Sequence, residues 1–434
     1  MARRLVVGDT GFEAAFAAIV TTARGRDEDV AGVVAEIIDD VRKRGDAALI
    51  ELTRRFDRVE LDADRLFLGA DEIDAAADAC PADTVAALEF AARRIEDHHR
   101  RQMPEDIDYR DEAGVRLGAR WTPVDAAGVY VPGGTAAYPS SVLMTVLPAK
   151  VAGVGRIVMA MPTPGGALNP AAMAAARLTG IDRILRVGGA QAIAALALGT
   201  ATVDAVDVIV GPGNAYVAAA KRQLFGVVGI DAIAGPSEIV VVADTANDPE
   251  WIAADLLAQA EHDTAARSIL ITDDTAFADA VEAAVERQLD GLERADIAGA
   301  SWRDNGAILC VARIADAAPL IDRLAPEHLA LAVADPDALA AKVRHAGAIF
   351  LGRYTPEAIG DYVAGPNHVL PTERGARFSS GLSVLNFLKR SSIIGCDATS
   401  LARLGPAAIS LAEAEGLGAH ARSVALRLGP DGKD

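Results

Sequence analysis

Hydrophobic and polar residues recur with two periodicities along most of this chain, one typical of strands and one typical of helices. From residue 127 onward, short apolar runs alternate with longer amphipathic stretches. This alternation predicts parallel sheets with helical crossovers. The expected strands are residues 129–131, 156–161, 183–187, 207–210, 238–243, 267–272, 307–311, 329–333 and 348–351. The expected helices are residues 140–154, 170–178, 190–198, 214–225, 251–262, 275–292 and 336–345, with another that ends at residue 324.

The two ends of the chain depart from this alternation. Residues 115–123 alternate as a strand, and the segment before them has helical periodicity at residues 11–24, 28–44, 46–56 and 82–103. Near the C-terminus, residues 379–390 predict strand and turn, and residues 406–428 predict a helical tail broken near Gly416. We expect an α/β fold with two units that meet near Gly235. The tail is too small to hold its own core, so we expect it to dock on another surface, with a second subunit as a candidate.

Composition narrows the class of partner and the compartment. The 434 residues carry 42 basic and 61 acidic side chains, a formal charge of −19 that argues against nucleic-acid and anionic-membrane partners. Three widely spaced cysteines exclude a disulfide framework and a Cys-rich zinc module, and they fit a reducing cytoplasm. The apolar stretches are too short to span a bilayer.

One expected helix carries polar residues at a spacing that suits a metal site. Asp248 can cap it and Pro249 suits its first turn. Gln259 and His262 lie three residues apart, so their side chains can converge on one point. Asp255 falls on the same face. An exposed polar face would have the same pattern, so this segment alone leaves both interpretations open.

Four glycine-rich turns are candidates for anion binding by backbone N–H groups. They are Pro132-Gly-Gly-Thr135, Gly188-Gly-Ala-Gln191, Gly211-Pro-Gly-Asn214 and Gly235-Pro-Ser-Glu238. Most follow an expected strand, where α/β sheets bind ligands. None matches the usual dinucleotide or P-loop pattern. Together they indicate a nucleotide site of unusual form, although each alone could be only a tight turn.

Further polar residues could carry acid–base or metal chemistry. Glu327 and His328 are adjacent in a loop, where a carboxylate and an imidazole can divide base and acid roles; a capped turn is the alternative. Asp361 and His368 lie in a turn-rich segment, and a buried Asp needs a partner such as a cation. In the tail, Glu415 and His420 flank the break at Gly416 and could project toward a common ligand.

Taken together, these segments resemble the histidinol dehydrogenase family over nearly the whole chain. Their combined order and spacing are highly specific, although each piece alone is weak. The segments that carry the resemblance are Gly128-Val-Tyr-Val-Pro-Gly-Gly134, Val187-Gly-Gly-Ala-Gln-Ala192, Gly211-Pro-Gly-Asn214, Ala234-Gly-Pro-Ser-Glu238, Gln259-Ala-Glu-His262, Ala325-Pro-Glu-His328 and Gly365-Pro-Asn-His368.

The resemblance implies a reaction and its cofactors. The family oxidises L-histidinol to L-histidine with two NAD⁺ in sequence, in the last steps of histidine biosynthesis, and retains histidinaldehyde between them. It implies an active-site zinc, which Mn²⁺ or Co²⁺ could replace because a glutamine ligand is uncommon for zinc. The implied metal ligands are Gln259, His262, Asp361 and His420. His420 would come from the other subunit of a homodimer.

The same resemblance assigns further roles. Glu327 and His328 match the family's acid–base pair. The positions that match substrate contacts are Ser237, Gln259, His262, His328, Asp361, His368, Glu415 and His420, and those that match NAD contacts are Tyr130, Gln191 and Asn214.

The expected organisation is two incomplete Rossmann-like units in a domain-swapped homodimer. Residues 25–126 and 236–380 would form the metal and catalytic unit, and residues 127–235 the NAD unit. Residues 1–24 would pack on the dimer or the tail, and residues 381–434 would complete the partner's site. A related dehydrogenase of another small polar alcohol is the alternative function. A zinc hydrolase and a non-catalytic nucleotide- or metal-binding protein are the alternatives from other classes.

Overall fold

The computed structural model describes residues 2–21, 28–133, 138–233 and 235–429. The chain forms two compact units, each described here by itself. The first comprises Met1–Arg101 and Asp125–Phe387, and the second comprises Gln102–Val124 and Leu388–Asp434. The first unit contains two six-stranded sheets, named sheet A and sheet B below.

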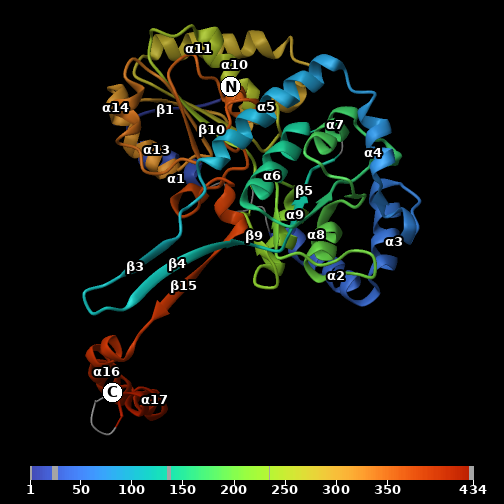
Figure 1. Ribbon diagram of the computed structural model, residues 1–434. Helices are drawn as coiled ribbons and strands as arrows, with labels where there is room; N and C mark the ends of the chain where they lie inside the picture. Colours follow the sequence, from blue (N-terminus) through green and yellow to red (C-terminus); the bar gives the residue numbers. More distant parts are fainter. Residues whose placement is uncertain (1, 22–27, 134–137, 234, 430–434) are drawn as a thin grey trace. The chain divides into compact units, whose positions relative to one another are not determined.

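Sheet A is parallel throughout, with the strand order β1-β12-β11-β10-β13-β14. Alternate residues of its central strand enter opposite layers: Val240 and Val242 pack with one set of helices, and Ile239 and Val241 with the other. The strands are β1 (Arg3–Val6), β10 (Glu238–Ala243), β11 (Arg267–Thr272), β12 (Ala307–Cys310), β13 (His328–Ala332) and β14 (Ala348–Leu351). The helices are α1 (Phe12–Thr21), α13 (Ala318–Leu324) and α14 (Pro336–Ala340) in one layer, and α10 (Pro249–Ala260), α11 (Thr275–Leu289) and α12 (Ala295–Asn305) in the other (Figure 1).

Sheet B has the order β2-β7-β6-β5-β8-β9, and only β2 runs antiparallel to its neighbour. Its strands are β2 (Phe67–Leu68), β5 (Ala126–Tyr130), β6 (Arg156–Ala160), β7 (Ile184–Leu185), β8 (Val208–Val210) and β9 (Gly229–Ile230). The helices of this half are α2 (Glu28–Arg44), α3 (Asp46–Asp57), α4 (Ala70–Ala77), α5 (Ala82–Arg100), α6 (Pro139–Ala152), α7 (Pro170–Leu178), α8 (Gly189–Leu198) and α9 (Ala215–Leu224).

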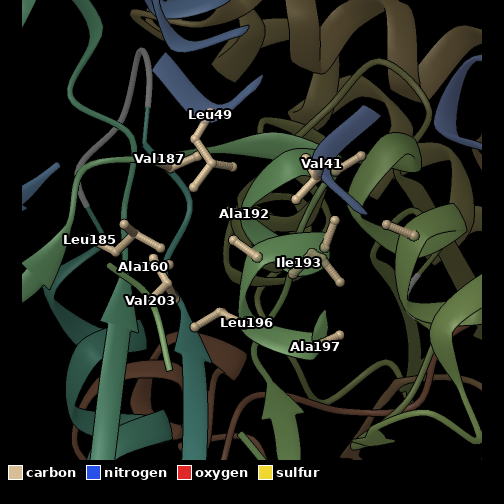
Figure 2. Packing of buried hydrophobic residues seen from close by; sticks show 14 of the residues in the cluster. Val41, Leu49, Ala160, Leu185, Val187, Ala192, Ile193, Leu196, Ala197 and Val203 are labelled. Atoms are coloured by element: carbon tan, nitrogen blue, oxygen red, sulfur yellow. The ribbon is translucent and has the colours of Figure 1, made fainter. Parts of the chain in front are cut away.

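The core of sheet B explains why the N-terminal helices belong to it. Figure 2 shows Val41 of α2 and Leu49 of α3 in one cluster of buried residues with Ile193 and Leu196 of α8. Leu185 of β7 lies in the same cluster of buried residues. These side chains are almost fully removed from water, so α2 and α3 are held by hydrophobic burial against this sheet.

The second unit contains an antiparallel three-stranded sheet and two helices. The sheet has the order β15-β4-β3, from β3 (Ile107–Arg110), β4 (Arg116–Pro123) and β15 (Leu388–Gly395). The helices α16 (Ala398–Ala414) and α17 (Gly418–Leu428) pack on each other. Asp397 caps α16 through the backbone N–H of Ser400, and Gly416, with φ of 73°, lies in the break between the helices.

The alternating pattern predicted most elements between residues 126 and 351, three of them with their observed bounds in sheet A. The prediction omitted β1, β2, β3, β9, α4, α12 and the short helix over Glu357–Tyr362. The strands among them have at most four residues, too few for a pattern to stand out. The tail helix begins at Ala398, earlier than expected, and is interrupted near Gly416 as expected. No helix in the described part of the chain is long and apolar enough to cross a membrane.

The expectation for residues 25–126 was wrong. They were expected with the catalytic unit, but β2 pairs with β7, and α2 and α3 share the core of sheet B. Residues 1–24 were expected on the dimer or the tail; within this chain, β1 pairs with β12 and Phe16 is fully buried beside sheet A. Residues 22–27 lie outside the described residues. Which sheet a segment joins depends on long-range pairing, which local periodicity does not encode.

Candidate active site

The polar residues of the first unit converge at the amino ends of two neighbouring strands of sheet A. β10 begins at Glu238 and β13 begins at His328, and the register places Ile239 opposite His328. Glu327 immediately precedes β13. Helix α10 brings Gln259 to the same place, and the short helix α15 (Glu357–Tyr362) brings Glu357 and Asp361.

Helix α10 forms as its sequence predicts at its start and differs at its end. The Asp248 side chain accepts a hydrogen bond from the backbone N–H of Glu250, and Pro249 occupies the first turn. The helix ends at Ala260. Gln259 is fully buried, whereas His262 lies in the following turn and is exposed. The exposed-face alternative is therefore excluded for Gln259.

The imidazole of His328 is buried with different surroundings at its two nitrogens. Nδ1 lies 3.2 Å from the carbonyl oxygen of Glu238 and 3.3 Å from Oε1 of Glu357. Oxygens on this side favour the tautomer that carries its proton on Nδ1. Nε2 lies 3.7 Å from Oδ1 of Asp361 and has no hydrogen-bond partner among the described residues. Burial lowers the pKa of His328 to about 3, so the ring is neutral with a free lone pair on Nε2.

Glu327 is held behind the ring by the backbone. Its Oε2 accepts a hydrogen bond of 3.0 Å from the backbone N–H of Glu238 and lies 3.6 Å from Nδ1 of His328. Burial raises the pKa of Glu327 well above its ordinary value. Glu327 and His328 are therefore a fixed carboxyl–imidazole pair, which agrees with the paired arrangement expected from the sequence and excludes an exposed capped turn.

Gln259 and Glu357 meet on the Nδ1 side of His328. The amide group of Gln259 lies 3.2 Å from Nδ1 of His328 and faces two acceptor oxygens, Oε1 of Glu357 at 3.1 Å and the carbonyl oxygen of Glu238 at 3.3 Å. Only the amide nitrogen can donate to these oxygens, so the nitrogen lies on that side and the amide oxygen is turned away. Glu357 is itself buried, and its second oxygen, Oε2, has no partner among the described residues.

Asp361 and His368 lie on the other side of the cluster. Nδ1 of His368 donates to the backbone carbonyl of Asp361 at 2.9 Å, which leaves Nε2 of His368 toward Ser141 Oγ at 3.5 Å. Burial raises the pKa of Asp361 to about 7 and lowers that of His368 to about 4. Ser141 belongs to the first turn of α6, so the two halves of the first unit touch at this point.

The charge balance of this cluster fits a divalent cation. The carboxyl groups of Glu327, Glu357 and Asp361 lie within 3.7 Å of the ring nitrogens of His328, and burial raises the pKa of each. His328, Glu357 and Asp361 each offer a ligand atom, and these atoms lie within 4.8 Å of one another. Dehydrated carboxylates, a neutral imidazole and buried atoms without partners are the donor set that a metal ion needs.

The three residues expected to contact NAD lie at the carboxyl edge of sheet B. Tyr130 ends β5, and its hydroxyl accepts from the backbone N–H of Gly189 at 3.1 Å. Gln191 is buried in the first turn of α8, and Asn214 caps α9 through two backbone N–H groups. This edge is where parallel sheets bind nucleotides. Gly134 and Thr135 of the first glycine-rich turn, and Ala234, lie outside the described residues.

The turn at Gly211 is fastened by a buried ion pair. Lys221 Nζ lies 2.7 Å from Oδ1 of Asp231 and donates to the carbonyl of Gly211 at 2.5 Å. Oδ2 of Asp231 accepts from the backbone N–H of Gly211 at 2.7 Å. Both charged side chains are less than 5% exposed. The pair therefore fixes both polar groups of the Gly211 backbone and with them the turn that leads to Asn214.

Of the remaining expected site residues, Ser237 lies at the same end of β10 as the cluster, and two belong to the second unit. Ser237 is half-buried immediately before β10. Glu415 and His420 belong to the second unit, where Glu415 follows α16 and His420 lies in the first turn of α17; both are exposed.

Comparison with known proteins identifies the family. The family model described as histidinol dehydrogenase matches residues 21–428. The chain is 63% identical to the histidinol dehydrogenase of Rhizobium meliloti (strain 1021) over 428 residues, which cover 99% of both chains. It is 64% identical to that of Rhodospirillum rubrum over 429 residues, again 99% of both.

The chain belongs to the histidinol dehydrogenase family. Its fold agrees with this, because the crystal structure of histidinol dehydrogenase from Elizabethkingia anophelis superimposes with a TM-score of 0.93 at 35% identity over 98% of each chain. Membership confirms the resemblance and the oxidoreductase class expected from the sequence.

The sequence did not predict two of the buried residues at this site. Glu238 was considered only as the end of a glycine-rich turn, yet its backbone N–H and carbonyl contact Glu327 and His328. Glu357 was not expected in the site, because it lies in no motif and nothing in its local sequence distinguishes it from a surface glutamate. Only the packing of α15 shows that this carboxyl group is buried.

Proposed function

We propose that this protein oxidises L-histidinol to L-histidine with two molecules of NAD⁺, as the final steps of histidine biosynthesis. The observation that carries the proposal is the fixed pair Glu327–His328, in which Nε2 of a neutral buried imidazole has no hydrogen-bond partner among the described residues and faces Asp361. A neutral imidazole with a free lone pair can take the hydroxyl proton that alcohol oxidation must remove.

Gln259, His262 and Asp361, with His420 of the partner subunit, are the residues that would hold a zinc ion. The amide oxygen of Gln259 is turned away from the acceptors that hold its nitrogen, and the pKa of Asp361 is raised, so both groups suit a cation. A bound zinc would supply Lewis acidity and orient the imidazole and amine of histidinol. Mn²⁺ and Co²⁺ suit the same nitrogen and oxygen donors.

The acid–base steps follow from the two buried side chains. In the first oxidation, His328 accepts the hydroxyl proton while the carbinol carbon loses a hydride to NAD⁺, which gives the aldehyde. Ionised Glu327 then takes a proton from water as that water adds to the aldehyde, and protonated His328 returns its proton to the aldehyde oxygen, which gives the hydrate and a neutral imidazole again. His328 next accepts a proton from the hydrate while its carbon loses a hydride to the second NAD⁺, and the carboxylic acid that forms ionises to the carboxylate. No cysteine thioester is needed in this scheme.

NAD⁺ would bind at the carboxyl edge of sheet B through Tyr130, Gln191 and Asn214. Ser237, His368 and Glu415 would contact the substrate, with Glu415 suited to its ammonium or imidazole N–H. His368 is close to Ser141 of α6, so a substrate held there would lie near the helix that follows β5. Nucleotide and alcohol would thus approach each other within the first unit.

The tail is the part we assign to a homodimer. Residues 381–434 carry the exposed Glu415 and His420, and we propose that they complete the site of the partner subunit. Mixing a His420→Ala chain with a His262→Ala chain would then restore part of the activity, because one hybrid site keeps both ligands. No recovery in verified heterodimers would show that each site is built within one chain.

The stoichiometry of NADH tests the reaction directly. Metal-loaded protein with limiting L-histidinol and excess NAD⁺ should form two NADH per histidinol, with histidine as product and no accumulated aldehyde. One NADH per substrate with released aldehyde would contradict the proposal. Turnover of another amino or acidic alcohol, with none of histidinol, would favour a related dehydrogenase.

A further inference from the structure

Glu357, the first residue of α15, is a buried acidic residue to which no role has been assigned above. Its side chain is 3% exposed and carries a carboxyl group deep inside the first unit. One carboxyl oxygen lies within 3.3 Å of two proposed site residues, Gln259 and His328. A buried carboxylate at this position needs a reason, because its dehydration costs free energy unless its interactions compensate.

We propose that Glu357 is a positioning residue for two neighbouring side chains. It orients the amide of Gln259 so that the amide oxygen is available to the metal ion. It also orients the ring of His328 so that Nε2 is available to the substrate. The inference rests on the proposed function, since it assigns the support of that same site. Glu357 itself touches neither substrate nor cofactor in this assignment.

The amide of Gln259 gives the first step of the argument. An amide can be turned by 180° with little change in shape, so its orientation depends on its hydrogen-bond partners. Oε1 of Glu357 at 3.1 Å and the carbonyl of Glu238 at 3.3 Å both require a donor, and the amide nitrogen supplies two N–H groups. Without Glu357, the carbonyl of Glu238 is the remaining acceptor oxygen beside Nδ1 of His328, so the amide is held less firmly in this orientation. The oxygen would then spend less time in the orientation a metal requires.

The ring of His328 gives the second step. Oε1 of Glu357 lies 3.3 Å from Nδ1, beside the carbonyl oxygen of Glu238 at 3.2 Å. These two oxygens favour the proton on Nδ1 and hold the ring edge that faces away from Asp361. The same carboxyl oxygen thus orients a proposed metal ligand and the proposed base, as supporting residues around metal sites commonly do.

Direct metal ligation is the competing role for Glu357, since its Oε2 has no partner among the described residues and the group lies close to Asp361. The two roles differ in how Glu357 and Gln259 depend on each other. A positioning residue acts through Gln259, so removing Gln259 removes its effect. A second ligand acts on the metal itself, so the two losses would be independent.

A double-mutant cycle on zinc affinity tests the inference without using turnover. Zinc dissociation constants would be measured by competition with a chromophoric chelator for wild type, Glu357→Ala, Gln259→Ala and the double variant. We expect Glu357→Ala to weaken zinc binding about 10- to 100-fold in the wild-type background, and to change it less than about threefold in the Gln259→Ala background. Glu357→Gln keeps an oxygen acceptor and should recover part of the affinity.

A second readout addresses the ring. At saturating zinc, Glu357→Ala should still reduce kcat for histidinol, because His328 is no longer held. Asn247→Ala is the matched control. Asn247 is buried beside the same sheet and donates a hydrogen bond of 2.6 Å to the carbonyl of Ala332. Ala332 lies at the end of β13 opposite to His328. The control variant should lower the melting temperature with zinc affinity unchanged.

The outcomes separate the inference from the proposed function. Equal losses from Glu357→Ala in both backgrounds, or unchanged affinity in a wild type that binds zinc and turns over histidinol, would overturn the inference alone. Wild type that binds no zinc would overturn it together with the metal part of the proposed function. Coupled losses in a protein that does not oxidise histidinol would support the inference and refute the substrate.

Discussion

Replacing Lys221 with methionine should destabilise the protein and weaken its affinity for NAD⁺. Methionine keeps most of the side-chain volume but leaves Asp231 as an uncompensated charge in a position only 4% exposed. Breaking a buried ion pair from one side costs about 3–5 kcal/mol. For 434 residues the entropy of unfolding is about 0.9 kcal/mol per degree, so the melting temperature should fall by about 4 °C if unfolding is cooperative.

The functional part of this prediction comes from Gly211. Lys221 and Asp231 hold the carbonyl and the N–H of that residue, and Asn214 follows three residues later. Initial-rate kinetics should therefore show a raised KM for NAD⁺ with a smaller change in the KM for histidinol, and calorimetry should show the same for NAD⁺ binding. The double variant Lys221→Met/Asp231→Leu should regain part of the stability without regaining NAD⁺ affinity. An unchanged KM for NAD⁺ in a clearly destabilised Lys221→Met protein would refute the link between the ion pair and the nucleotide site.

Three further predictions concern other parts of the first unit. Gly211→Ala should lower the melting temperature and the affinity for NAD⁺ much more than Gly226→Ala. Both glycines have positive φ, but a Cβ at Gly211 would clash with the carbonyl oxygen of Tyr130, whereas Gly226 faces open space. Thermal melts and NAD⁺ titrations of the two variants test this. Burial raises the pKa of Asp57 to about 6, so ionised Asp57 destabilises the folded protein above pH 6. Asp57→Asn should therefore have a higher melting temperature than wild type at pH 8, and this difference should disappear below about pH 4. A difference that does not change with pH would show that the ionisation of Asp57 is not its cause. Ile193→Ala, which empties part of the fully buried cluster of sheet B, should cost about 2–5 kcal/mol in denaturant unfolding, and a loss below 1 kcal/mol would show that the cluster relaxes around the gap.

The elements of sheet A show what the local pattern could predict. Residues 238–243 and 267–272 contain continuous apolar runs between turn signals, which is the pattern expected of strands buried on both faces. Both strands form with those bounds. The N-cap Asp248 and Pro249 likewise placed the start of α10 close to its observed position. These are short-range properties, because a strand or a cap depends on residues only a few positions away.

The candidate site was only partly accessible to the same reasoning. Adjacent Glu327 and His328 were recognisable as a pair of complementary groups, and the order of the motifs indicated the family. Periodicity did not reveal that Glu238 supplies both backbone groups to that pair, or that α15 buries Glu357 beside Gln259. The distance in sequence between these residues is far beyond the range of any local pattern.

The sequence by itself determined the α/β class, most strands and helices of residues 126–351, and the family through the order of its motifs. The tertiary structure alone decided that the helices of residues 28–100 join sheet B, that β1 joins sheet A beside β12, and that the carboxyl groups of Glu327, Glu357 and Asp361 meet around His328. Local structure follows from side-chain periodicity and capping, which neighbouring residues specify. Sheet membership and pKa values follow from burial and pairing between distant segments, which exist only once the chain has folded.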